Sequence, residues 1–295
     1  MTSRARPGVR SWLALPFTAL IFLIHPIIAL SRPSAVFQDP GIGWHLVTGR
    51  WILESGTVPR EDLFSFTALG RPWISYSWLF EAGGAALEKL GGLPLFATAC
   101  VLIYALLPVL VFRRALRLGA SLAPALLATI LAYLVLASHA LARPHILTYV
   151  FFAIMLERLS DVQEGRLPVR SLWWLPLLAL LWCNVHSGFP AGLTLTGIFA
   201  AVAGLRAFVR HDAEEWRRAR GFAVTLALMV LATFVNPSGP RLHVEIVRHL
   251  GMSATRYFSE FQSPDFHPSH VSIFAFELTV LLVVVVVGFV GRRLA

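Results

Sequence analysis

The chain has 295 residues, of which 57% are hydrophobic and only 14% are charged, and its mean hydropathy is +0.69. A soluble domain carries roughly 25% charged residues. These values exclude an ordinary soluble domain and predict an all-α polytopic membrane protein.

Apolar runs along the chain predict membrane-spanning helices, because a bilayer requires about 20 apolar residues per span. Two runs, 146–156 and 172–185, are shorter. They are interpreted as spans because each is bounded by charge on one side, and a loop exposed to lipid would leave backbone groups unpaired. About eight spans are expected: 12–30, 93–112, 122–138, 146–156, 172–185, 189–209, 222–235 and 271–290.

The distribution of arginine indicates the orientation, because cytoplasmic connections retain positive charge. With both termini in the cytoplasm, sixteen of the 25 basic residues fall on the cytoplasmic side. They are Arg4, Arg6, Arg10, Arg113, Arg114, Arg117, Arg158, Arg166, Arg170, Arg206, Arg210, Arg217, Arg218, Arg220, Arg292 and Arg293. The net charge of +9 therefore reflects topology, and it predicts contact with a lipid bilayer and no nucleic-acid partner.

The first apolar stretch is expected to be a retained span, because no small-residue cleavage site precedes Arg32. The outer loop that follows, 32–90, is long, polar and aromatic. Apolar residues from Trp44 to Ile52 recur at helical spacing, which predicts a helix lying in the membrane interface. A second such helix is expected over 77–90, with Glu81 on its wet face. Together with the last outer loop, 236–270, these segments form one integral membrane domain, 1–295.

Acidic residues of the first outer loop are candidates for catalysis. Asp39 lies just beyond the first span, and a carboxylate held near hydrocarbon has a raised pKa, which makes it a better base. Capping of the next helix is the alternative role for Asp39. Glu61 and Asp62 form a second acidic element, which fits a metal-ligand pair or a turn after Pro59 equally well.

Basic and amide side chains on the outer side are candidates for substrate binding. Arg143 has a guanidinium fork that suits a phosphate, although snorkelling to lipid head groups accounts for it equally well. Arg241 allows the same two interpretations. Asn184 and His186 end the fifth span, either as caps of a broken helix or as the lining of a cavity. The remaining candidates are Trp44, His45, His145 and Asn236; because polar groups near hydrocarbon need partners, these side chains are expected to face one outward-facing cavity.

Histidine spacing gives no metal signature. His139 and His145 are six residues apart, as are His243 and His249, while His267 and His270 are three apart. None of these pairs forms a HExxH motif or a bundle ligand pattern. The sequence predicts no metal ligands, and it does not identify a cofactor.

Six short segments carry a family resemblance: 39–50, 58–67, 142–145, 182–189, 235–239 and 261–266. An Asp just outside the first span, a large outer loop with two interfacial helices and a ladder of short-looped spans resemble the C-type (GT-C) membrane glycosyltransferases. These are outward-facing integral enzymes that use polyprenyl-phosphate-linked sugars. In combination, the six segments are similar to a group of bacterial inner-membrane proteins placed near that superfamily.

The resemblance implies an inverting glycosyltransferase in the bacterial inner membrane. Asp39 would take the proton of the acceptor hydroxyl, with Asp62 or Glu61 as the second acid. Arg143 and Arg241, with His145, would hold the phosphate of the polyprenyl-phosphate-linked sugar. The chain departs from the family in having Asp-Pro-Gly from Asp39 where paired acids are common, and in being shorter. The alternatives are a non-catalytic GT-C-like membrane protein and a lipid or solute transporter.

Overall fold

The structure is a computed structural model that describes residues 10–31 and 33–252. Within these residues every element is helical, apart from an isolated bridge between Glu61 and Pro72, so the predicted helical class is confirmed there. The α-helices are α1 (Arg10–Ser31), α2 (Gly41–Ser55), α3 (Trp78–Arg117), α4 (Leu122–Leu136), α5 (His145–Gln163), α6 (Leu175–Val185), α7 (Pro190–Arg210), α8 (Ala213–Ala232) and α9 (Arg241–Leu250). Short 3-10 helices are η1 (Pro33–Phe37), η2 (Ala137–His139) and η3 (Val169–Leu172).

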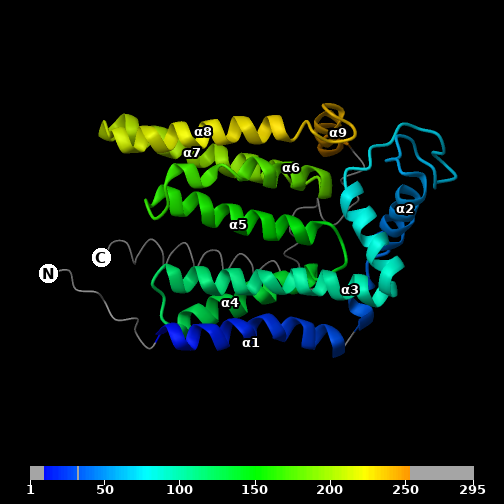
Figure 1. Ribbon diagram of the computed structural model, residues 1–295, viewed down its shortest axis with the longest axis horizontal. Helices are drawn as coiled ribbons and strands as arrows, with labels where there is room; N and C mark the ends of the chain where they lie inside the picture. Colours follow the sequence, from blue (N-terminus) through cyan, green and yellow to red (C-terminus); the bar gives the residue numbers. More distant parts are fainter. Residues whose placement is uncertain (1–9, 32, 253–295) are drawn as a thin grey trace, which may run out of the picture.

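The helices form a bundle with a cap at one end (Figure 1). Helices α1, α4, α5, α6, α7 and α8, with the second part of α3, run side by side along the longest axis. Helix α7 packs along α8, and α3 contacts α1, α4 and α5. Helices α2 and α9 and the first part of α3 lie at one end, which we call the cap end; the α7–α8 connection lies at the other.

Helix α3 bends between the cap and the bundle. Gly91 and Gly92 have non-helical backbone angles, and Gly92 has φ 70° and ψ −175°, a conformation that is essentially restricted to glycine. Pro94 follows in the first turn of the second part, where its missing N–H costs no helical hydrogen bond. The predicted helix over 77–90 is therefore present, but it is joined to the next helix through this bend.

Local sequence signals explain the ends of two other helices. Helix α2 ends at Gly56, which has φ 68° and donates its N–H to the Ile52 carbonyl oxygen at 2.9 Å, as a C-terminal glycine cap does. Helix α8 begins after Asp212, whose side chain accepts from the Glu214 N–H at 2.8 Å. Gly49 lets α2 approach α3 closely, because a Cβ there would lie 2.0 Å from the Glu81 carbonyl oxygen.

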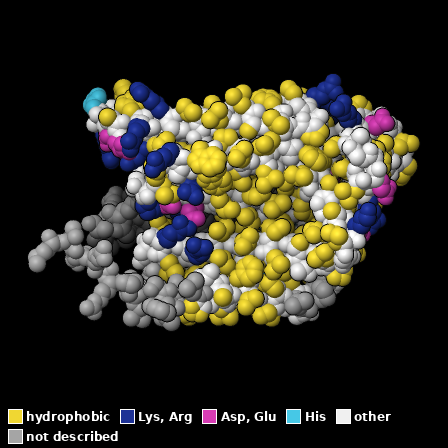
Figure 2. Space-filling view, in the orientation of Figure 1, with side chains coloured by type: hydrophobic (Ala, Val, Ile, Leu, Met, Phe, Trp, Pro, Cys, Tyr) yellow, Lys and Arg dark blue, Asp and Glu magenta, His cyan; other side chains and the backbone are white. Residues whose placement is uncertain are grey.

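The face of the bundle in Figure 2 is apolar in its middle and charged at its ends. Large hydrophobic side chains that are exposed on the bundle helices include Leu127, Ile130, Leu205 and Leu231. Among the described residues, α3 and α7 are long and apolar enough to cross a membrane. An extended exposed apolar surface of this kind is typical of contact with a membrane or a partner.

Helices occupy seven of the eight expected spans, although the number that cross a membrane stays a prediction. Helix α9, within the last outer loop, was not predicted. Several parts of the sequence argument lie outside the described residues: Arg4, Arg6, Arg292, Arg293, His267, His270, the segment 261–266 and the span 271–290.

Candidate functional site

An ion pair between Asp39 and Arg143 joins two connections at the cap end. The Asp39 Oδ2 lies 2.7 Å from the Arg143 Nε, and its Oδ1 accepts from the Gly41 N–H at 2.6 Å. Asp39 therefore stabilises the start of α2 and also contacts the arginine 104 positions later in the chain. The contact with Gly41 matches the capping alternative for Asp39, while a catalytic role for Asp39 stays a prediction.

Main-chain bonding fixes the same two connections beside the ion pair. The Ala142 N–H donates to the Val36 carbonyl oxygen at 2.9 Å, and both residues are buried. Since Arg143 follows Ala142 directly, its backbone is held while its side chain reaches Asp39. The guanidinium is about one third exposed, and the carboxylate is 12% exposed. The ion pair is thus accessible from one side.

His45 and Glu81 form a second charged contact, between α2 and α3. The His45 Nδ1 lies 3.0 Å from the Glu81 Oε1, and the Glu81 Oε2 accepts from the Ser75 hydroxyl at 2.5 Å. Glu81 is only 3% exposed. Its expected position on the wet face of an interfacial helix is wrong, because the carboxylate has two buried polar partners.

His186 follows the last residue of α6 and contacts α5. Its Nδ1 lies 2.8 Å from the Thr148 hydroxyl and accepts from the Gly188 N–H at 3.1 Å. Burial, followed by the nearby charges of His145, Arg143 and His45, lowers the pKa of His186 to about 3. His186 is therefore neutral at physiological pH and lies close to the Asp39–Arg143 pair and to His45.

Asn184 ties the end of α6 to the start of α3 and to the connection that follows α8. Its Oδ1 accepts from the Trp78 indole N–H at 2.7 Å, and its amide donates to the Val235 carbonyl oxygen at 2.9 Å. The side chain is buried. A mainly apolar groove of about 520 Å³ lies against it. The groove is lined by Trp78, Leu79, Leu177, Leu180, Leu181, Asn184, Val235, Asn236 and Pro237.

The second acidic element forms a turn. The Asp62 carboxylate accepts from the backbone N–H groups of Phe64 and Ser65, each at 2.9 Å, and from the Ser65 hydroxyl. Hydrogen bonds from Ser65, and then from Phe64, lower the pKa of Asp62. Glu61 is exposed beside the bridge to Pro72. Of the alternatives for this element, the turn is what these contacts describe, and among the described residues no cluster of three or more metal-ligating side chains occurs.

The other predicted binding residues have local contacts. Trp44 packs edge-on against Phe64 and Trp73. Asn236 donates to the Thr233 and Gly239 carbonyl oxygens and so shapes its own turn.

His145 begins α5 and Arg241 begins α9. The His145 Nε2 lies 3.1 Å from the His139 carbonyl oxygen. Arg241 is exposed, and within residues 10–31 and 33–252 it forms no ion pair. A phosphate contact of Arg241 stays a prediction.

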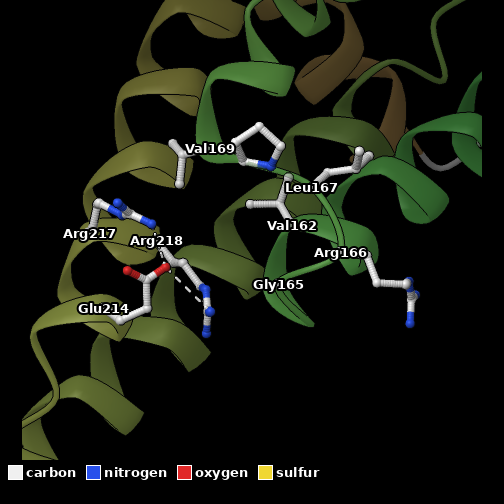
Figure 3. A pocket seen from close by; sticks show the side chains of 9 residues that line it. Val162, Gly165, Arg166, Leu167, Val169, Glu214, Arg217 and Arg218 are labelled. Carbon is white, nitrogen blue, oxygen red and sulfur yellow. Dashed lines mark hydrogen bonds and ion pairs between the residues drawn. The ribbon is translucent and has the colours of Figure 1, made fainter. Parts of the chain in front are cut away.

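A separate cavity of about 320 Å³ lies at the opposite end of the bundle (Figure 3). Its arginines have acidic partners: Arg217 and Arg218 pair with Glu214 on α8, and Arg166 pairs with Asp161 at 2.7 Å. This compensation leaves little positive charge for a ligand. None of the predicted site residues lines this cavity, whose lining is Val162, Gly165, Arg166, Leu167, Pro168, Val169, Glu214, Arg217 and Arg218.

Sequence reasoning missed three members of the group at the cap end, namely Ser75, Glu81 and Thr148. Ser75 and Glu81 lie six residues apart on either side of a helix start, and nothing in this spacing indicates that a histidine of another helix contacts Glu81. Thr148 lies one helical turn after Pro144-His145 on the same face of α5. That spacing is the one signal that could have placed Thr148 beside the predicted residues.

Comparisons with protein-family models, with curated proteins and with solved structures found no match to this chain.

Proposed function

We propose that the protein is an integral membrane glycosyltransferase that moves a sugar from a polyprenyl phosphate to an acceptor hydroxyl, with inversion. The observation that carries the proposal is the Asp39–Arg143 ion pair, 2.7 Å long and partly exposed. It joins a carboxylate that can accept a proton to a guanidinium fork that can bind a phosphate. These are the two groups that this reaction requires.

The apolar middle of the bundle supports a membrane location (Figure 2). We propose that the bundle crosses the inner membrane of a bacterium about eight times, with the cap end outside and both termini in the cytoplasm. The arginines around the α7–α8 connection then lie on the cytoplasmic side, as the positive-inside rule requires. The ion pair lies at the outer interface, where a lipid-linked sugar presents its phosphate.

Donor binding comes first in the proposed reaction, because the donor phosphate replaces Asp39 as the partner of Arg143. When the donor binds, Arg143 transfers from Asp39 to the phosphate, and the Asp39 carboxylate becomes available as a base. The acceptor hydroxyl gives its proton to Asp39 while its oxygen bonds to the anomeric carbon. The bond from that carbon to the phosphate oxygen breaks, and the polyprenyl phosphate leaves with the electron pair. Arg143 offsets the charge that develops on the leaving group.

The groove beside Asn184 suits the isoprenoid chain of the donor. Three leucines of α6, with Leu79 and Val235, supply its aliphatic lining, and the Trp78 indole N–H is bonded to the Asn184 side chain in the same groove. Asn184 lies two residues before His186, which itself lies close to Arg143. We propose that the tail lies in this groove while the phosphate binds at Arg143.

The test is a transfer assay with purified protein and a panel of radiolabelled polyprenyl-phosphate sugars. Removing a general base costs 10²- to 10⁴-fold, so Asp39→Asn should lower the rate about 100-fold or more. Glu54→Gln is the matched control, because Glu54 is an exposed acid on α2 with no predicted role in the site; it should retain transfer. Full activity in Asp39→Asn, with normal expression, rules out the base assignment.

The alternatives predict different outcomes of the same preparation. A transporter moves lipid or solute across reconstituted vesicles without transferring sugar. A non-catalytic protein of the same fold does neither, and its Asp39–Arg143 pair then serves only to fasten the two connections. Absence of transfer with every donor of the panel, together with vesicle transport, would replace the proposed function.

A further inference from the structure

The hydrogen bonds around His186 determine where its proton lies. A backbone N–H can only donate, so the bond of 3.1 Å from the Gly188 N–H requires a lone pair on the His186 Nδ1. Because neutral imidazole carries one proton, that proton lies on Nε2. The ring is therefore held as a single tautomer with an N–H at the position farthest from its own backbone.

Thr148 and Trp182 reinforce this tautomer. The Trp182 indole can only donate, and it donates to the Thr148 oxygen at 2.8 Å. The Thr148 hydroxyl then donates in turn to the His186 Nδ1, 2.8 Å away. Trp182 is fully buried, so this relay starts from a rigid part of the bundle. A second proton on Nδ1 would face the Gly188 N–H, which can only donate.

The surroundings of His186 favour an anion. Arg143, His145 and His45 lie close enough for their charges to act on the ring, and they disfavour its protonation. Across the described residues, none accepts a hydrogen bond from the His186 Nε2–H. The neutral Nε2–H of His186, together with the Arg143 guanidinium, can bind a negatively charged oxygen. Because the imidazole is uncharged, it adds no positive charge to the empty site.

We propose that His186 is a phosphate-binding residue that donates its Nε2–H to an oxygen of the lipid-linked phosphate, next to Arg143. The choice of phosphate rests on the proposed function, while the tautomer and the donor role follow from the bonds to Gly188, Thr148 and Trp182. Thr148 acts as a positioning residue, because it holds the imidazole in the donating form.

His45 provides an internal contrast. Its Nδ1 faces the buried Glu81 carboxylate at 3.0 Å, and an ionised carboxylate only accepts. When neutral, His45 therefore carries its proton on Nδ1 and a lone pair on Nε2. His186 and neutral His45 thus have opposite tautomers, and the nitrogen resonances of a single histidine-labelled sample can distinguish them.

The test is nitrogen NMR of the full chain labelled with ¹⁵N-histidine in detergent micelles. His186 should show a protonated Nε2 and an unprotonated Nδ1 at every pH from 5 to 8, whereas neutral His45 should show the reverse. Adding a polyprenyl monophosphate should shift the His186 Nε2 resonance. A proton on Nδ1, or titration of His186 near its ordinary pKa, overturns the inference.

Variants test the donor role by binding affinity for the same polyprenyl monophosphate. His186→Ala should weaken binding roughly tenfold or more, as expected for loss of a hydrogen bond to a charged group. His186→Gln, which retains an N–H donor, should restore most of the affinity. His211→Ala, at the opposite end of the bundle (Figure 1), should leave it unchanged. Unchanged binding in folded His186→Ala overturns the proposal.

Failure of this inference is distinguishable from failure of the proposed function. If the phosphate binds through His186 but no sugar is transferred from any donor, the proposed function fails and the binding residue stands. If sugar is transferred while His186→Ala binds and reacts normally, the proposed function stands and the binding residue is wrong.

Discussion

Two polar contacts between α2 and α3 differ in burial, and this difference allows a quantitative test. In His45–Glu81 the side chains are 15% and 3% exposed, whereas in the Arg50–Glu88 ion pair they are 52% and 16% exposed. Both pairs join the same helices, and their acids lie seven residues apart, or about two turns. Removing each acid in turn therefore isolates the effect of burial.

The expected loss for Glu81→Ala follows from its two hydrogen bonds. The carboxylate accepts from His45 at 3.0 Å and from Ser75 at 2.5 Å, and a hydrogen bond to a charged group contributes about 1.5–3 kcal/mol. Breaking a buried charged contact costs about 3–5 kcal/mol in all. Glu88→Ala should cost no more than about 1 kcal/mol, because exposed ion pairs are screened by solvent.

The assay is reversible unfolding of purified protein by titration with sodium dodecyl sulfate in mixed micelles, followed by tryptophan fluorescence. Glu81→Gln keeps partners for both Ser75 and His45 but removes the charge, so its loss should fall between those of the two alanine variants. Equal free energies of unfolding for Glu81→Ala and Glu88→Ala would refute the argument that burial makes the His45–Glu81 contact the stronger one.

Three further outcomes are expected. Gly49→Ala should destabilise the protein by about 2 kcal/mol or more, because its Cβ would lie 2.0 Å from the Glu81 carbonyl oxygen of α3. Gly43 lies on the same helix and has open space around it, so Gly43→Ala should stabilise the protein by up to about 1 kcal/mol. The same unfolding titration measures both free energies. A cysteine at Phe66, which is 97% exposed, should react with a membrane-impermeant maleimide on intact cells, and one at His211 only after permeabilisation; the reverse result would invert the proposed orientation. The turn made by Asp62 should persist above the ordinary aspartate pKa of 3.8 and loosen as the pH falls through the lowered pKa of Asp62. Loosening would be measured as faster hydrogen exchange of the turn amides. Unchanged protection of these amides in acid would show that the carboxylate does not hold the turn.

The helices could be predicted from the sequence because each extends over a long apolar run. The predicted helix near Trp44 is also present, since its apolar spacing reports a face that packs on α3. Helix α9 was missed because its sequence is polar and short. Leu242 of this helix is buried by contacts with other parts of the chain, and the sequence of α9 alone does not indicate those contacts.

The candidate site was predictable in part. Asp39 and Arg143 were both placed on the outer side, where polar groups near hydrocarbon need partners, and the structure joins them in an ion pair; that all the candidates face one cavity stays a prediction. The burial of Glu81 could not be predicted, because it depends on the angle at which α2 crosses α3. The tautomer of His186 could not be predicted either, because it depends on Thr148 of α5 and Trp182 of α6.

The bend at Gly91-Gly92 has a consequence for how the chain can change. In an unbroken helix each residue advances by about 100°, so an insertion anywhere rotates every side chain beyond it. The bend interrupts this rotation between the cap and the bundle parts of α3. Trp78 and Glu81 can therefore keep their contacts with Asn184 and His45 while the second part of α3 changes in length. Substitutions in one part of α3 then leave the other part in place.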